Sequence, residues 1–434
     1  MKRFLPFFAL IIIVALALLA PSTEITTVEN SQIDTGDTAW LLMSAALVLL
    51  MTPGLAFFYG GMVRKKNVIS TMLQSFVCMG LITIIWVVFG FSLVFGEDIG
   101  GIIGAPTTFY MMKGMLGNDV WPALPTIPIA LFAMFQLKFA VITPALITGA
   151  FAERIKFNSY LIFITLFVIL IYSPLAHATW HPEGILAKMG VLDFAGGTVV
   201  HMSAGWAALA SALYLGKRKE QVHNPSRITY VILGTSLLWF GWFGFNAGSA
   251  GGANTLAASA LATTTTASAA AAIAWIFFDI LKGKKPSAMG ACIGAVVGLV
   301  AITPAAGFVT IPNSLVIGVI AAIISNLLVI WRTNKGIDDT LDVFPCHGVG
   351  GMTGMVLTSV FAHNSVNNAV TDNGLLYGET KLFTAHLIAL VCTSLFAFLG
   401  SLLLLKITNL LSPLRVNEHA EVLGLDISQH NEEL

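Results

Sequence analysis

Eleven apolar stretches follow one another along this chain, and their length decides the solvent in which it can fold. Each is long enough, or nearly so, to cross the hydrocarbon core of a bilayer, which is about 30 Å thick. A backbone in hydrocarbon must satisfy its own hydrogen bonds, so we predict an all-α membrane protein in which every stretch is a helix. The predicted spans cover residues 38–60, 68–95, 123–151, 158–176, 196–215, 228–247, 256–281, 288–304, 314–331, 344–361 and 384–405.

The composition agrees with a membrane environment and excludes other classes of protein. Hydrophobic residues make up 56% of the chain and charged residues only 10%, whereas soluble domains carry about 25% charged residues. The formal net charge is zero, which excludes the basic surface that binds nucleic acid. The four cysteines lie in apolar runs without a CxxC spacing, so we expect buried free thiols, with neither a disulfide framework nor a zinc site.

The loops between the predicted spans carry their positive charges on alternate sides. Sixteen Lys and Arg residues fall in the loops of one side, and three, Lys113, Lys188 and Lys381, fall in those of the other. Because cytoplasmic loops are enriched in Lys and Arg, we predict eleven spans with the N-terminus outside and the C-terminus inside.

The first residues, "MKRFLPFFALIIIVALALLAPST", combine a basic start, an apolar run and small residues. This pattern is typical of a secretory signal peptide, and we predict that residues 1–22 are cleaved; the alternative is an uncleaved first span. Residues 23–410 then form the membrane domain. Residues 411–434 form a polar cytoplasmic tail, for which disorder is the simplest expectation.

Two sequence features recur five spans apart. The "VITPA" of the third span returns as "AITPA" in the eighth, and Asp193 with His201 in the fifth returns as Asp342 with His347 in the tenth. Because five is odd, the two halves would have opposite orientations. This offset predicts an inverted five-plus-five repeat followed by a final helix, with a site near the middle of the membrane.

His201 and His347 are the polar residues that most need explanation, because ionisable groups inside a membrane are costly and are usually functional. Two neutral imidazoles that share one proton leave one outer donor and one outer acceptor, which suits a small neutral polar molecule. The alternative is a structural histidine bonded to a backbone carbonyl. We expect Asp342 to cap a helix N-terminus, while Asp193 either caps a helix or attracts a cation.

Aromatic residues gather near the predicted outer ends of several spans. Phe245 and Ser249 lie in "GWFGFNAGSAGG", Phe139 lies in "FQLKFA", and Trp180 lies in "AHATWHPEG". Such aromatics are commonly membrane anchors. Aromatic faces beside a hydroxyl also form a cation–π site for an ion of the ammonium type.

The chain resembles the ammonium transporter (Amt/Mep/Rh) family, and most closely its bacterial Amt branch. The resemblance is carried by "DTAWLLMSAALVLLMTPGLAFFYGGMVRKKNVIST", "ITGAFAERIKF", "LDFAGGTVVHM", "GWFGFNAGSAG", "DVFPCHGVGG" and the "GLDISQH" of the tail. It implies eleven spans, an inverted repeat and a homotrimer in which each subunit has its own pore. It also implies that the protein lies in the cytoplasmic (inner) membrane. It also implies that the tail regulates transport through a P-II-type nitrogen-signalling protein.

The resemblance assigns roles to residues by motif. His201 and His347 match the twin pore histidines of the family, and Phe139 and Phe245 match its stacked phenylalanine gate. Lys138 departs from the family pattern, since a small or neutral residue is commoner before the gate. On a helix it points roughly 100° away from Phe139, so we expect it to face outward or to extend toward the membrane surface.

The outer recruitment site implied by the resemblance consists of Trp180, Ser249 and Phe139, with Asp193 nearby. Ammonium would be held there, would lose a proton, and would cross the lumen as ammonia. An ammonium sensor and a neutral-solute channel for water or gas remain as alternatives. No nucleophile–base set or cofactor loop is recognisable in the sequence, so we expect neither an enzyme nor a cofactor or bound metal.

Overall fold

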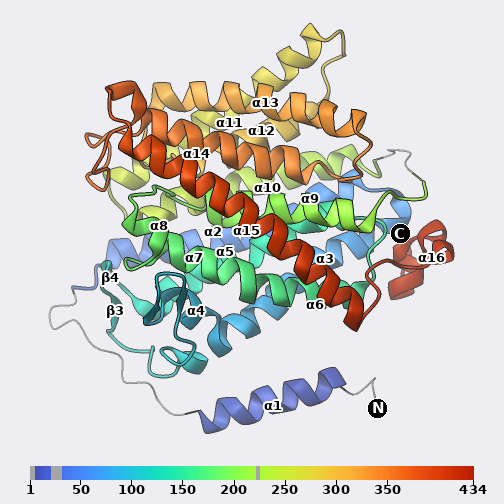
Figure 1. The fold of residues 1–434 in the computed structure, drawn as a ribbon, viewed down its shortest axis with the longest axis horizontal. Helices are drawn as coiled ribbons and strands as arrows, with labels where there is room; N and C mark the ends of the chain where they lie inside the picture. Colours follow the sequence, from blue (N-terminus) through green and yellow to red (C-terminus); the bar gives the residue numbers. More distant parts are fainter. Residues whose placement is uncertain (1–4, 21–31, 221–224) are drawn as a thin grey trace.

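The structure, a computed structural model, describes residues 5–20, 32–220 and 225–434. Figure 1 shows a bundle of long helices with α1 lying outside it. The helices are α1 Leu5–Leu19, α2 Thr35–Met62, α3 Val68–Ile85, α4 Phe91–Phe95, α5 Ile129–Phe151, α6 Phe157–Phe167, α7 Ser173–Trp180, α8 Ile185–Lys188, α9 Ser203–Leu215, α10 Ile228–Ala247, α11 Thr255–Leu281, α12 Ala288–Ile302, α13 Ile311–Asn334, α14 Gly350–Phe361, α15 Lys381–Leu411 and α16 Glu418–Leu423. The predicted cleavage after residue 22 falls outside the described residues.

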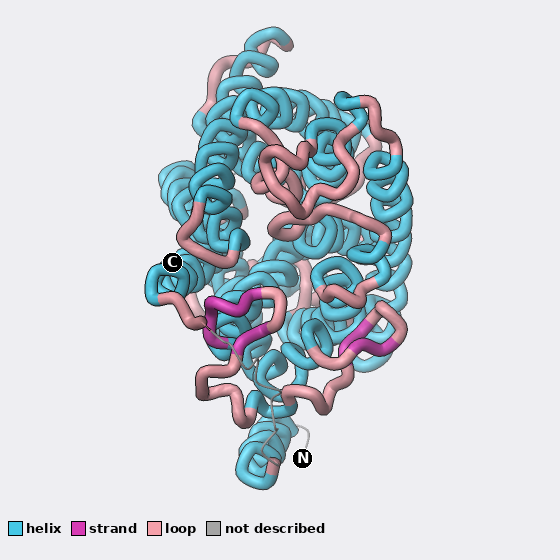
Figure 2. The backbone as a smooth tube through the Cα atoms, turned by 90° about the vertical axis from the view of Figure 1, so that its left-hand side faces the viewer, coloured by secondary structure: helices cyan, strands magenta, loops and turns pink. Residues whose placement is uncertain are grey.

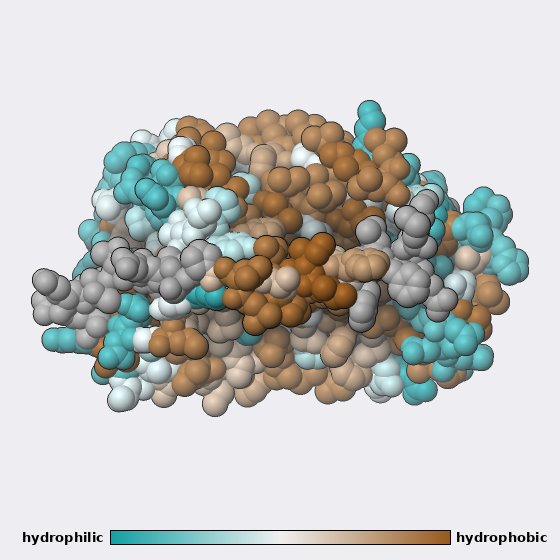
Figure 3. All heavy atoms as spheres, turned by 90° about the horizontal axis from the view of Figure 1, so that it is seen from below, coloured by the Kyte–Doolittle hydropathy of each residue, from teal (hydrophilic) through white to brown (hydrophobic). Residues whose placement is uncertain are grey.

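Within the described ranges, nine helical segments are long and apolar enough to cross a membrane. Two further predicted spans are present as shorter helices, α12 and the continuous helix 344–361. Large apolar side chains are exposed along α2, α10, α11, α13 and α15. Figure 3, which views the molecule from the side on which α1 lies, shows an apolar brown middle between more polar ends. The exposed apolar surface indicates a multi-pass membrane protein, because hydrocarbon is the solvent that such a surface requires.

The prediction of an all-α chain was wrong at one end of the bundle. Two short antiparallel hairpins lie there, as Figure 2 shows: β1 Asp98–Ile99 with β2 Ile103–Gly104, and β3 Val120–Trp121 with β4 Leu124–Pro128. The third predicted span therefore begins at Ile129 rather than at residue 123. Pro122, Pro125 and Pro128 explain the difference, because a proline has no N–H for a helix interior and favours extended backbone before it.

Several spans contain a π-helical segment, in which the backbone hydrogen bonds skip one residue more than in an α-helix. These segments are Trp86–Gly90, Val168–Tyr172, Gly197–Met202 and Phe344–Val349, and a further one, Asp426–His430, lies in the tail. Three of the four cysteines are buried as expected, but Cys392 on α15 is exposed. Its position on the outer surface of the last long helix accounts for the difference.

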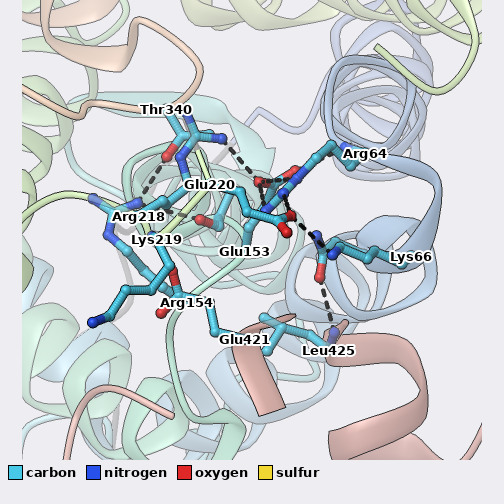
Figure 4. Close-up of polar contacts among 12 residues, drawn as sticks. Arg64, Lys66, Glu153, Arg154, Arg218, Lys219, Glu220, Thr340, Glu421 and Leu425 are labelled. Atoms are coloured by element: carbon cyan, nitrogen blue, oxygen red, sulfur yellow. Dashed lines mark hydrogen bonds and ion pairs between the residues drawn. The ribbon is translucent and has the colours of Figure 1, made fainter. Parts of the chain in front are cut away.

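A buried carboxylate organises the end of the bundle opposite the hairpins. Glu153 is 1% exposed and has a φ of 70°, a left-handed backbone that a side chain rarely adopts. Figure 4 shows that it lies between Arg64, whose Nε donates to it at 2.8 Å, and Arg218, whose Nη1 donates at 2.9 Å. Burial alone would raise the pKa of Glu153, but the hydrogen bond from Arg64 and the charge of Arg218 outweigh it and hold the pKa below its ordinary value.

The C-terminal tail packs against the two loops that carry Arg64 and Arg218 rather than remaining free. The carboxylate of Glu421 pairs with Arg415 at 2.8 Å and accepts the backbone N–H of Lys219 at 2.7 Å. Leu425 donates its N–H to Asn67 at 2.8 Å, and Asp426 accepts the N–H of Ser70 at 2.7 Å. The expectation of a disordered tail is therefore wrong for residues 417–430, because buried side-chain contacts hold them against the loops of their own chain.

The ion pairs of Glu153 with Arg64 and Arg218 should stabilise the folded protein. Glu153→Gln removes the buried charge that Arg64 and Arg218 share, leaving Arg218 with Asp338 and Arg64 with the exposed Glu220, and should lower the free energy of unfolding by about 3 kcal/mol. The thermal unfolding midpoint of the detergent-solubilised protein measures this loss. Because the pKa of Glu153 is lowered in the folded state, the stabilisation is complete above pH 4.5 and is lost as the pH falls further.

The matched control is Glu183→Gln, which removes an ion pair with Lys188 in which both side chains are 56% exposed. An exposed pair of this kind contributes at most about 1 kcal/mol. Equal midpoints for the two variants at neutral pH would contradict the role of Glu153.

Candidate functional site

The two predicted histidines meet in the middle of the bundle. His201 lies in the π-helical segment that leads into α9, and His347 lies in the one that leads into α14. Their Nδ1 atoms are 3.3 Å apart, and both side chains are buried. Two accepting nitrogens would repel each other at this distance, so one Nδ1 carries a hydrogen and the other does not. The pair of neutral rings then presents one Nε2 donor and one Nε2 acceptor.

Glycine residues let the two helices that carry His201 and His347, residues 197–215 and 344–361, approach each other closely. These are called the first and second histidine helices. A Cβ atom on Gly205 would lie 2.1 Å from the backbone nitrogen of Gly348, and one on Gly351 would lie 3.1 Å from the Cβ of His201. Any side chain at Gly205 would therefore push the segment that carries His347 away. Small residues serve this purpose where helices meet without a hydrophobic driving force between them.

The histidines border a narrow space whose other walls are apolar. Its volume is about 10 Å³, close to what one water-sized molecule requires. The indole of Trp242 stacks on His201 with ring centroids 5.3 Å apart, while its Nε1 donates to Thr303 at 2.9 Å. The indole N–H is thus occupied away from the histidines. The lining residues are Met51, Leu55, Phe58, Ile142, Leu146, Val200, His201, Leu238, Trp242, Phe245, Val296 and His347.

Two phenylalanines with rings inclined by 33° to each other close this lumen at one end. Phe139 and Phe245 have ring centroids 4.3 Å apart and are almost completely buried. Phe245 lines the lumen and lies 6.0 Å from the ring of His201, whereas Phe139 lines a larger cavity on the other side. The phenylalanine pair therefore separates the two spaces.

The larger cavity, the outer cavity, lies toward the hairpin end and has a volume of about 190 Å³. It brings together Trp180, Ser249 and Phe139, with the rings of Phe139 and Trp180 edge-to-face at 5.9 Å. Ser249 donates its hydroxyl hydrogen to the carbonyl of Phe245 at 2.8 Å, so the lone pairs of the hydroxyl oxygen remain available to a donor. Lys138 is half-buried and does not line the cavity, which fits the orientation expected from helix geometry.

Asp193 lies beside this cavity but does not line it. Its carboxylate accepts the N–H groups of Gly196, Gly197 and Thr198 at 2.8, 2.5 and 2.8 Å, together with the Thr198 hydroxyl at 2.5 Å. These contacts satisfy the free donors at the start of the segment that carries His201. Trp180 also donates its indole N–H to the backbone carbonyl of Asp193 at 3.1 Å. Of the two roles expected for Asp193, helix capping is the one that these hydrogen bonds fit.

The expectation that Asp342 caps the second histidine helix was wrong. Asp342 forms an ion pair with Arg332, and Asp339 instead accepts the backbone N–H of Phe344 at 2.7 Å. Asp339 precedes His347 by eight residues, the same separation as between Asp193 and His201. The equal spacing identifies Asp339 as the counterpart of Asp193. The sequence contains this match, but Asp342 lies nearer to His347 along the chain and was therefore predicted to be the counterpart.

His386 on α15 is a positioning residue that sequence reasoning missed. Its Nδ1 donates to the carbonyl of Met355 at 2.8 Å, and its Nε2 accepts the N–H of Leu192 at 2.9 Å. It therefore fixes the backbone directly before Asp193 and, through Asp193, the indole of Trp180. A histidine in the eleventh span was visible in the sequence, but its partners lie on two other elements.

Comparison with known proteins gives this arrangement a context. A model of the Ammonium Transporter Family matches residues 39–434. The chain belongs to the ammonium transporter family. It is 47% identical to a putative ammonium transporter of Methanothermobacter thermautotrophicus and 46% identical to an ammonium transporter of Bacillus subtilis, each over 92% of this chain and 98% of the relative.

Solved members of the ammonium transporter family share the fold. The crystal structure of Saccharomyces cerevisiae Mep2 matches with a TM-score of 0.84 and 34% identity, over 90% of this chain and 89% of that one. A protein described as a Sensor Amt Protein matches with a TM-score of 0.82 and 27% identity, over 91% and 98%. The family predicted from the sequence motifs is thereby confirmed, with relatives among bacterial and archaeal Amt proteins, and the chain shares the mostly helical fold of these structures.

The contacts of His386 generate a local prediction. His386→Leu leaves the buried N–H of Leu192 without an acceptor, which should cost about 1–3 kcal/mol. His386→Gln retains an acceptor and a donor and should restore much of this loss. Hydrogen exchange of the peptide covering residues 191–199 measures the effect: exchange should be faster in the Leu variant and near wild type in the Gln variant. Unchanged protection in the Leu variant would contradict the positioning role.

Proposed function

We propose that this chain is an ammonium transporter that recruits the cation in the outer cavity, removes one proton and conducts ammonia past His201 and His347. The observation that carries the proposal is the contact between the two imidazoles in an otherwise apolar lumen behind the phenylalanine pair. The polar groups in that lumen suit a molecule that both donates and accepts a hydrogen bond.

Recruitment uses two kinds of interaction in the outer cavity. The ring faces of Trp180 and Phe139 attract a cation through their π electrons. The free lone pairs of Ser249 accept a hydrogen bond from the same ion. Asp193 contributes by holding Trp180 and the first histidine helix in place, since its own oxygens are already occupied.

Removal of the proton decides selectivity. An intact cation in a dry lumen would lose its hydration, which costs tens of kcal/mol for an isolated charge in a low-dielectric medium. Ammonium avoids most of that cost by giving up a proton and continuing as ammonia. The proton crosses separately and rejoins ammonia on the far side, so one positive charge is transferred for each ammonium ion. Potassium is of similar size but has no proton to release. The lumen between Phe245 and His347 therefore admits ammonia and rejects potassium.

The arrangement in the membrane follows from the same proposal. We propose eleven spans with the N-terminus outside, an inverted five-plus-five repeat plus a final helix, and a homotrimer in the cytoplasmic membrane. The repeat is supported by the paired π-helical segments and by the equal spacing of Asp193–His201 and Asp339–His347. Residues 1–22 are proposed as a cleaved leader, in agreement with the position of α1 outside the bundle.

The tail is proposed as the regulatory element of the transporter. It contacts Lys66 and Asn67 in the loop after α2 and Lys219 in the loop after α9, so a partner that moves it would act on several helix ends at once. A P-II-type nitrogen-signalling protein is the proposed partner at this cytoplasmic face.

The decisive experiment compares wild-type proteoliposomes with those containing the His201→Ala/His347→Ala double variant. An ammonium pulse should evoke a saturable, ammonium-selective current in the wild type. The double variant should lose this current or begin to pass potassium, because the polar pair that selects ammonia is gone. A wild type that binds ammonium but gives no current would indicate a sensor. Ammonia or water flux without current or saturation would indicate a neutral-solute channel.

Deletion of residues 421–434 tests the tail. The truncated protein should lose binding of a P-II-type protein and show altered transport, because Arg415, Asn67 and Ser70 lose their partners. Deletion of the exposed residues 432–434 alone is the matched control and should change neither. Unaltered transport together with retained P-II binding after the longer deletion would contradict a regulatory tail.

A further inference from the structure

Three metal-binding side chains meet beside the outer cavity, although the cysteine pattern gave no sign of a metal site. Asp98 lies on β1, His177 on the last turn of α7, and His181 directly after α7. One ligand atom from each lies within 4.8 Å of the other two. His177 is fully buried and His181 is 8% exposed, while the side chain of Asp98 is 25% exposed. The cluster is therefore enclosed on the protein side and open to solvent at the carboxylate.

The ring of His177 is oriented as in a metal ligand. Its Nδ1 lies 2.7 Å from the carbonyl oxygen of Val94, which can only accept, so this nitrogen carries a hydrogen. Its Nε2 lies 2.9 Å from Oδ1 of Asp98, which also accepts. The lone pairs of Nε2 and the carboxylate would repel each other unless a positive charge lies with them. A proton or a metal ion can supply that charge, and metal-bound histidines typically donate their other N–H to a carbonyl in this way.

His181 supplies the second imidazole. Its ring is stacked on that of His177, with centroids 4.3 Å apart and planes inclined by 12°. A metal ion lies near the plane of each ring it binds, so one ring must turn for both to coordinate. His181 is the ring that can turn. His177 is held at both ring nitrogens, whereas the hydrogen bond found for the His181 ring among the described residues is the one that its Nδ1 accepts from the backbone N–H of Glu183 at 3.1 Å. The rotation has to bring the ligand atoms, which lie within 4.8 Å of one another, to the spacing of about 3.3 Å that Zn–N bonds of about 2.0 Å impose in a tetrahedral site.

We propose that Asp98, His177 and His181 form a site for a divalent transition metal, with Zn²⁺ as the best-suited ion. Two imidazole nitrogens and one carboxylate oxygen are ligands that Zn²⁺ accepts, with a fourth position left for water. The second oxygen of Asp98 is free to join them, since Oδ1 is the atom that accepts from Gly101 and His177.

The position of the site connects it to recruitment. The ring of His181 contacts the indole of Trp121 edge-on at 5.6 Å, and Trp121 lines the outer cavity. Zn²⁺ carries two positive charges, more than a single proton between His177 and Asp98 could supply, so its binding raises the net charge of the cluster. A bound metal therefore repels ammonium from the outer cavity and weakens recruitment. This consequence rests on the proposed function, whereas metal binding itself does not.

The test uses tag-free, chelator-treated protein in detergent and Zn²⁺ alone as the probe in titration calorimetry. Wild type should bind one Zn²⁺ per chain at this site, and His181→Ala and Asp98→Asn should each weaken binding at least about tenfold. His363→Ala, which alters an outer-loop histidine bonded to Ser365, is the matched control and should bind Zn²⁺ as wild type does. Two cluster variants are used so that a fold defect in one does not decide the result.

Co²⁺ provides an independent readout, because ligation by two imidazoles and a carboxylate gives visible absorption that should disappear in both cluster variants. Absence of Zn²⁺ binding to wild type, or equal binding by wild type and both cluster variants, would overturn the site. External Zn²⁺ should also raise the ammonium concentration needed for half-maximal current. Zn²⁺ binding without that rise, in a protein that does transport ammonium, would overturn the regulatory consequence while leaving the site.

Discussion

The contact between Nδ1 of His201 and Nδ1 of His347 is the interaction on which the rest of the pathway depends. Each ring is buried among apolar side chains, where a charged imidazole would have to give up its hydration. One shared hydrogen lets both rings stay neutral while their remaining nitrogens face the lumen. The lumen is then polar enough for a small hydrogen-bonding molecule, yet it offers no charge to hold an ion.

Much of the surrounding structure serves to bring these two rings together and keep them there. Gly205 meets Gly348 without side chains between them, and both histidines lie in π-helical segments. Asp193 and Asp339 satisfy donors at the starts of the two histidine helices. Because Asp193 also holds the indole of Trp180, the same carboxylate links the geometry of the outer cavity to that of the lumen.

The sequence was most informative where a long apolar run required a helix, or where burial of a polar group in a membrane has a high free-energy cost. Long apolar runs predicted the helices, and two histidines in a membrane indicated the centre of the pathway. The hairpin before Ile129 was not predicted because its residues are as apolar as those of a membrane span. Only the spacing of its prolines distinguishes it from a helix. The roles of Asp339 and His386 were not predicted for a different reason. Their roles depend on partners brought close by packing, which no local pattern records.

The central claim is that the lumen conducts ammonia and excludes ions that cannot lose a proton. Potassium permeation through the wild-type protein in proteoliposomes tests this claim most directly, with ammonium and a large excess of potassium on the same side. Potassium should leave the ammonium-evoked current unchanged, and potassium alone should evoke no current. A potassium current through the wild-type lumen, or block of the ammonium current by potassium, would contradict it.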